Sequence, residues 1–289
     1  MNHAMPHETL PTTAAGLQAT VKLNNGVEMP WLGLGVFQVT DEAEVEASVR
    51  TAINLGYRSI DTAAIYGNER GVGRAVKACG VPREQLFITT KLWNDEMRGD
   101  RCEVAFTESV ERLGLDYVDL YLLHWPIEGK IVPSWLVLEK LQRAGLARAI
   151  GVSNYMIPHL AELLDAAEIV PAVNQIEFHP YLQSRPLVAS CQAKGIVVEA
   201  WSPLMQAGAL LTDPVLAAIA GRHGRTVAQV VLRWDLQRGV VTIPKSVHAA
   251  RIAENAAVFD FLLTPAEMDA IDALDRNQRN GADPFNFNF

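Results

Sequence analysis

The stretch Gly56–Glu69, GYRSIDTAAIYGNE, determines how the rest of this chain is interpreted. It predicts a short strand that ends at Asp61, then a loop that carries Tyr66, then a helix that begins near Glu69. A strand end that presents an acid and a phenol before a helix is typical of active sites in α/β barrels. The alternative is structural: Asp61 caps a turn and Tyr66 packs on the loop.

The bulk properties of the chain exclude several classes of protein. Its 289 residues are 49% hydrophobic and 20% charged, which is enough apolar material for a large core. The net charge of −8 argues against a nucleic-acid or membrane partner. Three scattered cysteines without a CxxC pair indicate reduced thiols and a cytoplasmic location. Residues 1–19 lack the basic and apolar regions of a signal peptide and are predicted to be a flexible leader.

The chain after residue 30 alternates between apolar runs and amphipathic segments. The runs predict eight buried strands, at residues 31–37, 59–61, 86–91, 117–124, 149–153, 173–177, 196–201 and 240–243. The segments predict helices at residues 41–55, 69–79, 101–113, 135–144, 157–166, 185–194, 214–223, 226–237, 248–258 and 265–274. This alternation predicts an α/β fold, a (β/α)₈ TIM barrel with extra helices late in the chain. No linker divides it, so residues 20–289 are predicted to be one catalytic domain.

Glycines near the start of the chain point to a hairpin and away from a dinucleotide-binding sheet. Asn24–Gly26 lies between two short apolar runs and predicts an N-terminal β-hairpin. Residues 33–35 and 71–73 are Gly-x-Gly fragments, but Gln38 and Val76 stand where Gly-x-Gly-x-x-Gly needs its last glycine. A Rossmann site is therefore not supported.

Polar and aromatic residues cluster at the predicted strand ends, where barrel enzymes hold their functional groups. They are Phe37, Asp61, Tyr66, Lys91, Trp93, His124, Trp125, Ser153, Asn154, Gln175, His179, Trp201, Ser202, Lys245 and Ser246. The three tryptophans would line one mouth, which suits a flat or apolar ligand. No HExxH and no Cys/His cluster occurs, so no metal site is predicted.

Four of these residues suggest a proton donor. A free tyrosine is protonated at neutral pH, and a nearby lysine ammonium lowers its pKa. Tyr66 and Lys91, with Asp61 holding the lysine and His124 orienting a carbonyl oxygen, would protonate a developing alkoxide. That chemistry suits carbonyl reduction, and because no side chain carries a hydride, a nicotinamide cofactor is required.

Lys91, His124 and the nearby His179 also have other interpretations. Lys91 could mark the exit of a strand to solvent, and His124 could be a hydrogen-bonded structural histidine. His179 is interpreted as structural. A further reading makes Lys91 a Schiff-base lysine in a barrel aldolase or lyase.

Several ordered motifs resemble the aldo-keto reductase superfamily over about residues 21–275. They are residues 56–63 with 66–69, LLHWP at 122–126, IGVSNY at 150–155, IPKSV at 243–247 and RIAEN at 251–255. The chain is most similar to the bacterial 2,5-diketo-D-gluconate reductase and methylglyoxal reductase group. Trp201 and Phe37 fit that group, whereas residues 283–289 match no pattern of the family.

The resemblance implies a role for each site residue. Tyr66 is the proton donor, assisted by Asp61, Lys91 and His124. The implied NADP(H) contacts are Ser153, Asn154 and Gln175 at the nicotinamide amide, Trp201 on its ring, Ser202 and Leu204 at the pyrophosphate, Lys245, Ser246 and Arg251 at the 2′-phosphate, and Glu254 and Asn255 at the adenine. The predicted substrate contacts are Phe37, Trp93, His124 and Trp125. Two cations and a hydroxyl suit a phosphate monoester, which favours NADPH, although a solvated basic patch is the alternative for Lys245 and Arg251.

The expected function is NADPH-dependent reduction of a small carbonyl substrate by a monomer. A regulatory or NADPH-binding protein on a reductase-like barrel is the alternative, resembling one branch of the superfamily. The intact set of four catalytic residues favours the enzyme.

Overall fold

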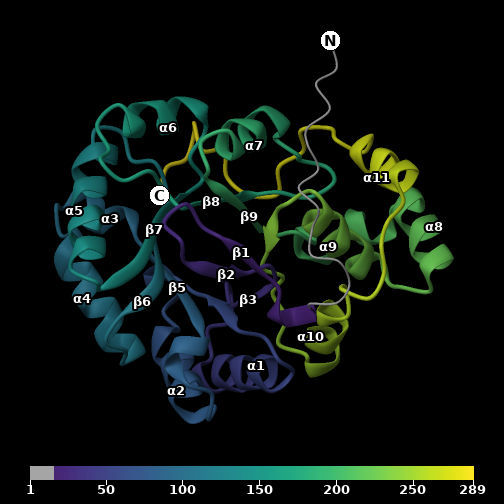
Figure 1. Cartoon of the computed structure of the whole chain (residues 1–289), viewed down its shortest axis with the longest axis horizontal. Helices are drawn as coiled ribbons and strands as arrows, with labels where there is room; N and C mark the ends of the chain where they lie inside the picture. Colours follow the sequence, from purple (N-terminus) through teal and green to yellow (C-terminus); the bar gives the residue numbers. More distant parts are fainter. Residues whose placement is uncertain (1–15) are drawn as a thin grey trace.

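The computed structural model describes residues 16–289, which form a closed barrel of eight parallel strands (Figure 1). The strands are β3 (Gly33–Gly35), β4 (Ser59–Asp61), β5 (Phe87–Leu92), β6 (Val118–Leu123), β7 (Ala147–Ser153), β8 (Val173–Glu177), β9 (Val197–Trp201) and β10 (Val241–Thr242). They pair in sequence order. Parallel bridges from Leu32 to Thr242 and from Gly35 to Lys245 close the ring. The predicted (β/α)₈ TIM barrel is confirmed.

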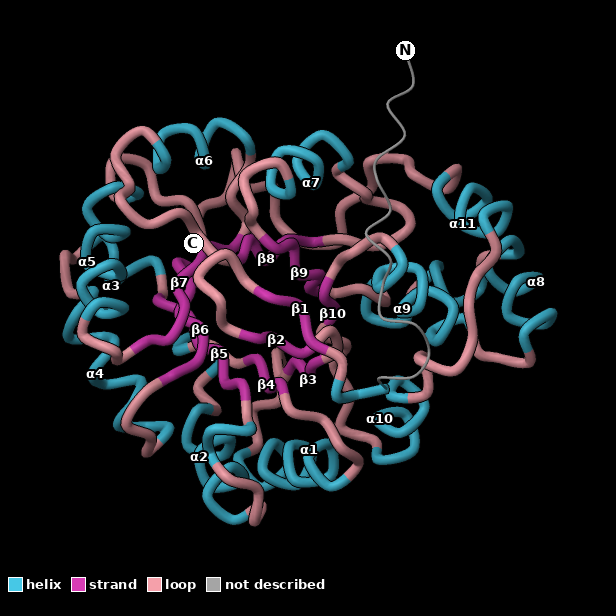
Figure 2. Tube along the Cα trace, viewed as in Figure 1, coloured by secondary structure: helices cyan, strands magenta, loops and turns pink. Residues whose placement is uncertain are grey.

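The helices surround the strands (Figure 2). Within residues 16–289 they are α1 (Glu42–Asn54), α2 (Glu69–Ala78), α3 (Asn94–Arg98), α4 (Cys102–Leu113), α5 (Ile131–Arg143), α6 (Ile157–Leu164), α7 (Arg185–Gln192), α8 (Pro214–His223), α9 (Val227–Gln237), α10 (Ala249–Ala256) and α11 (Pro265–Asp272). All predicted helices are present, and α3 is additional. The prediction that α5 begins at residue 135 is wrong, because Pro133 lies in its first turn, where no intrahelical N–H is needed. None of these helices is long and apolar enough to cross a membrane.

The predicted hairpin closes one end of the barrel. Its strands are β1 (Thr20–Lys22) and β2 (Glu28–Pro30), which pair antiparallel. Met29 is buried among apolar residues of the barrel interior. The side chain of Asn24 donates a hydrogen bond to the carbonyl of Pro171 at 3.0 Å. The hairpin therefore seals the end of the barrel that lies opposite the C-terminal strand ends.

The predicted leader, residues 1–19, is described only from residue 16 onward. Residues 1–15 lie outside the described residues. Gly16–Gln18 form a short 3₁₀ helix, and Leu17 packs against the core. Ala19 is buried. Leu17 and Ala19, which fall in the range predicted as a leader, therefore pack against the core.

Two glycines in α2 let this helix pack closely against its neighbours. A Cβ atom at Gly71 would overlap the side chain of Val45 in α1, and one at Gly73 would overlap the backbone carbonyl of Leu113 at the end of α4. The Gly-x-Gly fragment at residues 71–73 is thus a helix-packing feature.

Substituting Gly73 by alanine is expected to lower the free energy of unfolding by about 1–3 kcal/mol, as overpacking in a core does. The overlapping atom is backbone, so it cannot turn aside as a side chain would. Urea unfolding measures the loss. Arg70→Ala, at an exposed position of the same helix, serves as the control and should stay within about 0.5 kcal/mol of the parent. Equal stability of the two variants would show that α2 and α4 can separate without cost.

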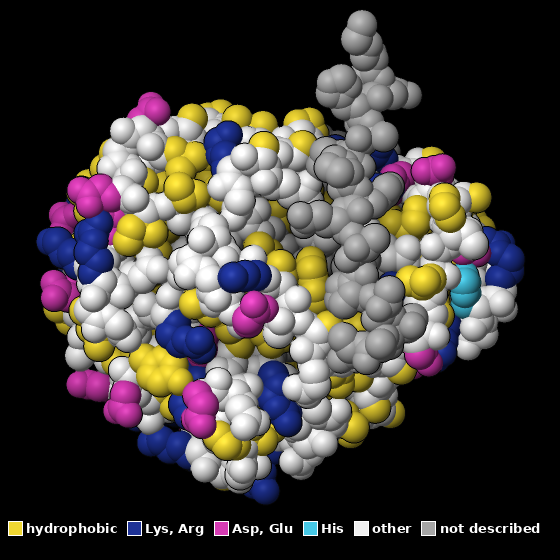
Figure 3. Space-filling model, in the orientation of Figure 1, with side chains coloured by type: hydrophobic (Ala, Val, Ile, Leu, Met, Phe, Trp, Pro, Cys, Tyr) yellow, Lys and Arg dark blue, Asp and Glu magenta, His cyan; other side chains and the backbone are white. Residues whose placement is uncertain are grey.

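The surface visible in Figure 3 carries Lys and Arg interspersed with Asp and Glu.

The three cysteines are free thiols: Cys102 and Cys191 are buried, and Cys79 is half-buried. Within residues 16–289, no three His, Cys, Asp or Glu side chains gather as a metal site would need.

Candidate active site

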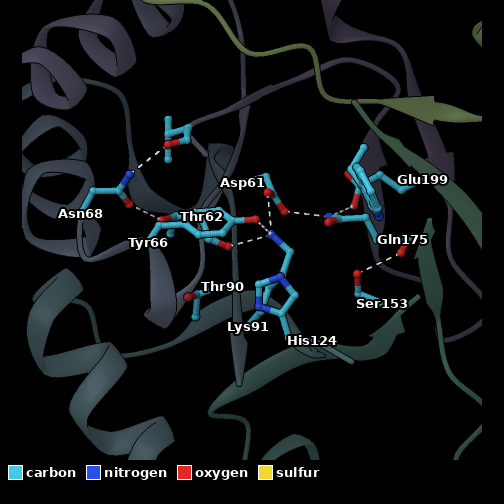
Figure 4. Close-up of polar contacts among 12 residues, drawn as sticks. Asp61, Thr62, Tyr66, Asn68, Thr90, Lys91, His124, Ser153, Gln175 and Glu199 are labelled. Carbon is cyan, nitrogen blue, oxygen red and sulfur yellow. Dashed lines mark hydrogen bonds and ion pairs between the residues drawn. The ribbon is translucent and has the colours of Figure 1, made fainter. Parts of the chain in front are cut away.

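A buried ammonium group lies at the centre of the polar cluster at the strand ends (Figure 4). Lys91, in β5, is fully buried. Its Nζ donates to Asp61 Oδ1 at 2.6 Å and to the carbonyl of Thr62 at 2.9 Å. The Oη of Tyr66 lies 3.4 Å from the same nitrogen. Sequence reasoning predicted that these side chains act together, and the fold brings them together.

Asn68, two residues after Tyr66, holds the loop that follows β4. Tyr66 ends a short 3₁₀ helix, η2 (Ala64–Tyr66). Asn68 is fully buried and accepts a hydrogen bond from Thr62 Oγ1 at 2.6 Å. Its Nδ2 donates to two backbone carbonyls in the loop after β3. The position of the phenol is therefore fixed by an asparagine whose role the sequence did not reveal.

The start of α2 is anchored in the same way. The buried Glu69 accepts a hydrogen bond from Thr90 Oγ1 in β5 at 2.6 Å. It also pairs with Arg112 of α4 at 2.6 Å. Thr90 precedes Lys91, so the helix that follows the tyrosine loop is tied to the strand that carries the lysine.

Burial keeps the hydroxyl of Tyr66 protonated. Burial raises the pKa of Tyr66, and although the Lys91 ammonium opposes this shift, the pKa stays above its ordinary value. The predicted effect of the lysine is present but is outweighed. Burial alone would lower the pKa of Lys91, yet the carboxylate of Asp61 and the neighbouring Tyr66 raise it overall. A protonated phenol therefore lies beside a charged ammonium.

His124 lies just past β6, next to the phenol. Its ring centroid is 5.8 Å from that of Tyr66 and 5.2 Å from that of Trp93. Burial, and then the charge of Lys91, hold the pKa of His124 well below its usual range. The imidazole is therefore neutral at neutral pH and has one N–H to donate.

The Schiff-base reading of Lys91 does not fit this environment. A nucleophilic lysine needs a neutral amine that a substrate can reach. Lys91 has no exposed surface, and its raised pKa keeps it charged. Its ammonium is also fixed by the Asp61 carboxylate.

The residues predicted at the nicotinamide amide form a connected group at the ends of β7, β8 and β9. Ser153 Oγ donates to the carbonyl of Gln175 at 2.9 Å. Asn154 donates to the carbonyl of His124 at 3.0 Å and accepts from Trp201 Nε1 at 2.9 Å. The indole of Trp201 is therefore held at the mouth by a hydrogen bond to Asn154.

The residues predicted at the cofactor phosphates lie after β9 and around α10. Lys245 and Arg251 are exposed, and neither forms an ion pair with another residue in the range 16–289. Ser246 is buried, with its Oγ accepting from the backbone N–H of His248. The Oγ of Ser202 is buried without a hydrogen-bond partner among the described residues.

The other three predicted cofactor residues differ in surroundings. Glu254 accepts from Thr226 Oγ1 at 2.9 Å, which ties α10 to the start of α9. Asn255 is buried. Leu204 is partly buried against the core.

The comparison with known families settles the class of this protein. The profile described as "Aldo/keto reductase family" matches residues 31–276. The chain belongs to the aldo/keto reductase family. The resemblance carried by the sequence motifs is thereby confirmed.

Similar proteins cover nearly the whole aldo/keto reductase chain. "Glyoxal reductase" of Bacillus subtilis (strain 168) is 57% identical over 275 residues, which are 95% of this chain and 98% of the relative. "Methylglyoxal reductase DkgA" of Salmonella typhimurium is 48% identical over 270 residues, 92% of this chain and 97% of the relative. The crystal structure of a Bombyx mori aldo-keto reductase in complex with NADP superposes with a TM-score of 0.85 at 40% identity, covering 91% of this chain and 95% of that one.

The Phe-rich tail of this aldo/keto reductase, residues 277–289, covers the aromatic residues of the site. Phe289 stacks on Trp93 with ring centroids 5.7 Å apart, and it lies edge-on to Trp125 at 5.1 Å. Phe287 lies 5.0 Å from Trp125. The tail is fixed by Arg98, which donates to the backbone carbonyl oxygen of Phe289 at 2.8 Å. Sequence reasoning assigned no contact to this segment, although the alternation of phenylalanines at 285, 287 and 289 was the available signal.

The tail is also bound at its start. The carboxylate of Glu177 accepts hydrogen bonds from the backbone N–H groups of Asn280 and Gly281. His179 lies 3.0 Å from the same carboxylate, which supports its interpretation as structural. Phe37 lies 4.9 Å from the ring of Tyr66 and is half-exposed.

One titratable residue of the site was missed by sequence reasoning. Glu199 lies in β9 and is fully buried. It accepts from Gln175 Nε2 at 2.7 Å, and the same nitrogen donates to Asp61 Oδ2 at 2.7 Å. A lone glutamate inside the apolar run of residues 196–201 was the signal that could have indicated it.

Proposed function

We propose how this protein, an NADPH-dependent carbonyl reductase of the aldo/keto reductase family, carries out the reduction. The observation that carries the proposal is the Tyr66 hydroxyl, 3.4 Å from the Lys91 ammonium, which is itself paired with Asp61 at 2.6 Å. Tyr66 gives its proton to the carbonyl oxygen as that oxygen becomes an alkoxide. Bound NADPH supplies the hydride that goes to the carbonyl carbon.

Each neighbour of Tyr66 has a separate task. The Lys91 ammonium stabilises the phenolate that forms as the proton leaves, because an adjacent positive charge lowers the free energy of the ionised form. Asp61 holds the ammonium in place from the other side. His124, neutral at neutral pH, donates a hydrogen bond to the carbonyl oxygen and orients it.

The donor groups after β9 and β10 fit a phosphate-bearing cofactor. Lys245 and Arg251 are exposed, form no ion pair within residues 16–289, and lie close in the sequence to Ser246. The buried Oγ of Ser202 has no hydrogen-bond partner among residues 16–289, and native proteins seldom leave such a donor unpaired. We assign these residues, with Leu204, Glu254 and Asn255, to the adenosine and phosphates, and Ser153, Asn154, Gln175 and Trp201 to the nicotinamide.

Removing either exposed cation should weaken NADPH selectively. Lys245→Ala or Arg251→Ala is expected to raise KM for NADPH by about 10–100-fold, the effect of one charge-assisted hydrogen bond. KM for NADH and the kcat should change little, because NADH lacks the 2′-phosphate. Steady-state kinetics with both cofactors measure the difference. Lys140→Ala, at an exposed lysine of α5, is the control. Equal losses with both cofactors would contradict the 2′-phosphate assignment.

The mouth of the barrel suits small carbonyl compounds. Phe37 and His124 pack against Tyr66, and Trp93 packs against His124. The tail packs on Trp93 and Trp125. Relatives of 57% and 48% identity are named for glyoxal and methylglyoxal. We assign the substrate to small aldehydes and dicarbonyls of this class. Loss of NADPH absorbance with glyoxal and methylglyoxal tests the assignment, and a wild-type enzyme that oxidises NADPH with neither compound would refute it.

The regulatory alternative makes a different prediction in the same assay. A binding protein would hold NADPH tightly and turn over no member of a broad carbonyl panel. The protonated phenol beside the buried ion pair favours the enzyme, because a protein that only binds NADPH has no need of a proton donor.

We propose a cytoplasmic monomer. The three free thiols suit a reducing compartment. Size-exclusion chromatography with light scattering tests the monomer, and a stable dimer at micromolar concentration would contradict it.

A further inference from the structure

A second carboxyl group faces the catalytic pair inside the barrel. Glu199 and Gln175 are register partners on the parallel strands β9 and β8. On the other side of Glu199, β10 contributes the apolar Val241. Figure 4 shows a continuous chain of hydrogen bonds from the lysine through Asp61 and Gln175 to Glu199.

The amide of Gln175 is fixed by the two acids that it joins. Its Nε2 donates to Asp61 Oδ2 and to Glu199 Oε2, both at 2.7 Å. Rotating the amide by half a turn would place its carbonyl oxygen against the Asp61 carboxylate, which only accepts hydrogen bonds and repels it. Asp61 is therefore held through both of its oxygens, by Lys91 on one and by Gln175 on the other. Without Glu199, only Asp61 would remain to orient the amide.

The charges in this buried group balance only when one carboxyl is neutral. Lys91 is the cation, while Asp61 and Glu199 are both acids with almost no exposed surface. Burial first, and then the charge of Asp61, raise the pKa of Glu199 to about 8. Tyr66 is the other titratable group that faces it. Glu177, the next inward acid along β8, is bound to the tail and to His179.

We propose that Glu199 is a positioning residue of the reductase: when protonated it keeps Gln175 and Asp61 in the arrangement that serves Tyr66, and when ionised it weakens proton donation. The inference rests on the proposed role of Tyr66 as proton donor. Ionised Glu199 adds a second negative charge near the phenol, which makes Tyr66 a weaker acid. Carbonyl reduction should therefore slow as the pH rises through the titration of Glu199.

The variant Glu199→Gln tests this directly, because an amide has the shape of the protonated acid and cannot ionise. In the wild type, kcat for carbonyl reduction at saturating NADPH is expected to fall by about three- to tenfold between about pH 7 and about pH 9. In E199Q that decrease should disappear while kcat at about pH 7 stays within about threefold of the wild type. A purely structural role would change activity without changing the shape of the pH profile.

A matched control separates this effect from the loss of any buried glutamate. Glu139 in α5 is buried and accepts hydrogen bonds from the backbone N–H groups of Glu168 and Ile169, away from the site. Glu139→Gln should keep the wild-type decrease in kcat. If E199Q keeps the decrease as well, or loses activity equally at every pH, the proposal is wrong. A wild type that reduces no carbonyl compound would instead overturn the proposed function.

A second measurement decides the proposal on the wild-type protein alone. The carboxylic-acid stretching band in infrared spectra of the wild-type protein should lose intensity between about pH 7 and about pH 9, as Glu199 ionises. In a folded E199Q protein this loss should be absent. No change in the acid band of the wild type across this range would overturn the proposal.

Discussion

Replacing Tyr66 with phenylalanine is expected to lower kcat for carbonyl reduction by about 10²–10⁴-fold, the usual contribution of a positioned general acid. Phenylalanine keeps the ring, and with it the 4.9 Å contact to Phe37, but it removes the hydroxyl that lies 3.4 Å from Lys91 Nζ. Affinity for NADPH should be unchanged, because the phenol is assigned to the substrate carbonyl. Single-turnover reduction measured under saturating NADPH reports the chemical step directly.

The control for this variant is another tyrosine that loses its hydroxyl. Tyr117 precedes β6 and its ring lies 4.2 Å from the guanidinium of Arg83, away from the site. Tyr117→Phe should retain the wild-type single-turnover rate. A Tyr66→Phe protein that binds NADPH and reduces substrate at a comparable rate would show that another group gives the proton.

Substituting Lys91 by methionine is expected to remove activity and to lower the free energy of unfolding by about 3–5 kcal/mol. Nearly all of the side chain of Asp61 is buried, so losing the ammonium leaves its charge unpaired in a low-dielectric interior. The same substitution takes away the cation that stabilises the phenolate of Tyr66. Urea unfolding and NADPH oxidation measure the two effects on one preparation.

Two further variants separate charge pairing from packing. Lys130→Met breaks the surface pair with the exposed Asp100, and it should change stability by less than about 1 kcal/mol. The double variant Asp61→Asn with Lys91→Met removes both charges. It should recover part of the stability of the single variant while remaining inactive. A single Lys91→Met protein of wild-type stability would mean that Asp61 takes up a proton without cost.

That Asp61, Tyr66, Lys91 and His124 lie together could be predicted because of where they stand in the sequence. Asp61, Lys91 and His124 each lie at or just past the end of an apolar run. Packing no longer requires an apolar side chain at such positions, so a polar residue there indicates a functional role. The regular alternation of apolar runs and amphipathic segments predicted the barrel, because eight strands that are buried on both faces have few other arrangements. The family motifs then agreed with both inferences.

The contacts that support the site were less visible from the sequence, for a physical reason. Asn68 and Gln175 act through partners distant in the sequence, Val36 in one case and Asp61 in the other. A single sequence shows which residues are polar but not which of them meet across the barrel. Trp93 illustrates the same limit. Its stacking on Phe289 depends on where the tail packs in the folded protein, which a single sequence does not show. The pKa of Tyr66 also depended on burial, which spacing alone does not give.

The bond from Gln175 to Asp61 joins residues 114 positions apart, whereas the pairing of Asp61 with Lys91 spans only 30. Contacts of such sequence separation form late in folding, because the loop-closure entropy has to be overcome before they can stabilise anything. A chain folded as far as β6 would already contain Asp61, Tyr66, Lys91 and His124, yet the second oxygen of Asp61 would have no partner. Catalytic competence would then arrive only once β8 has joined the sheet and Gln175 has reached Asp61. The return of reductase activity during refolding would therefore report when β8 is in place, independently of when the helices form.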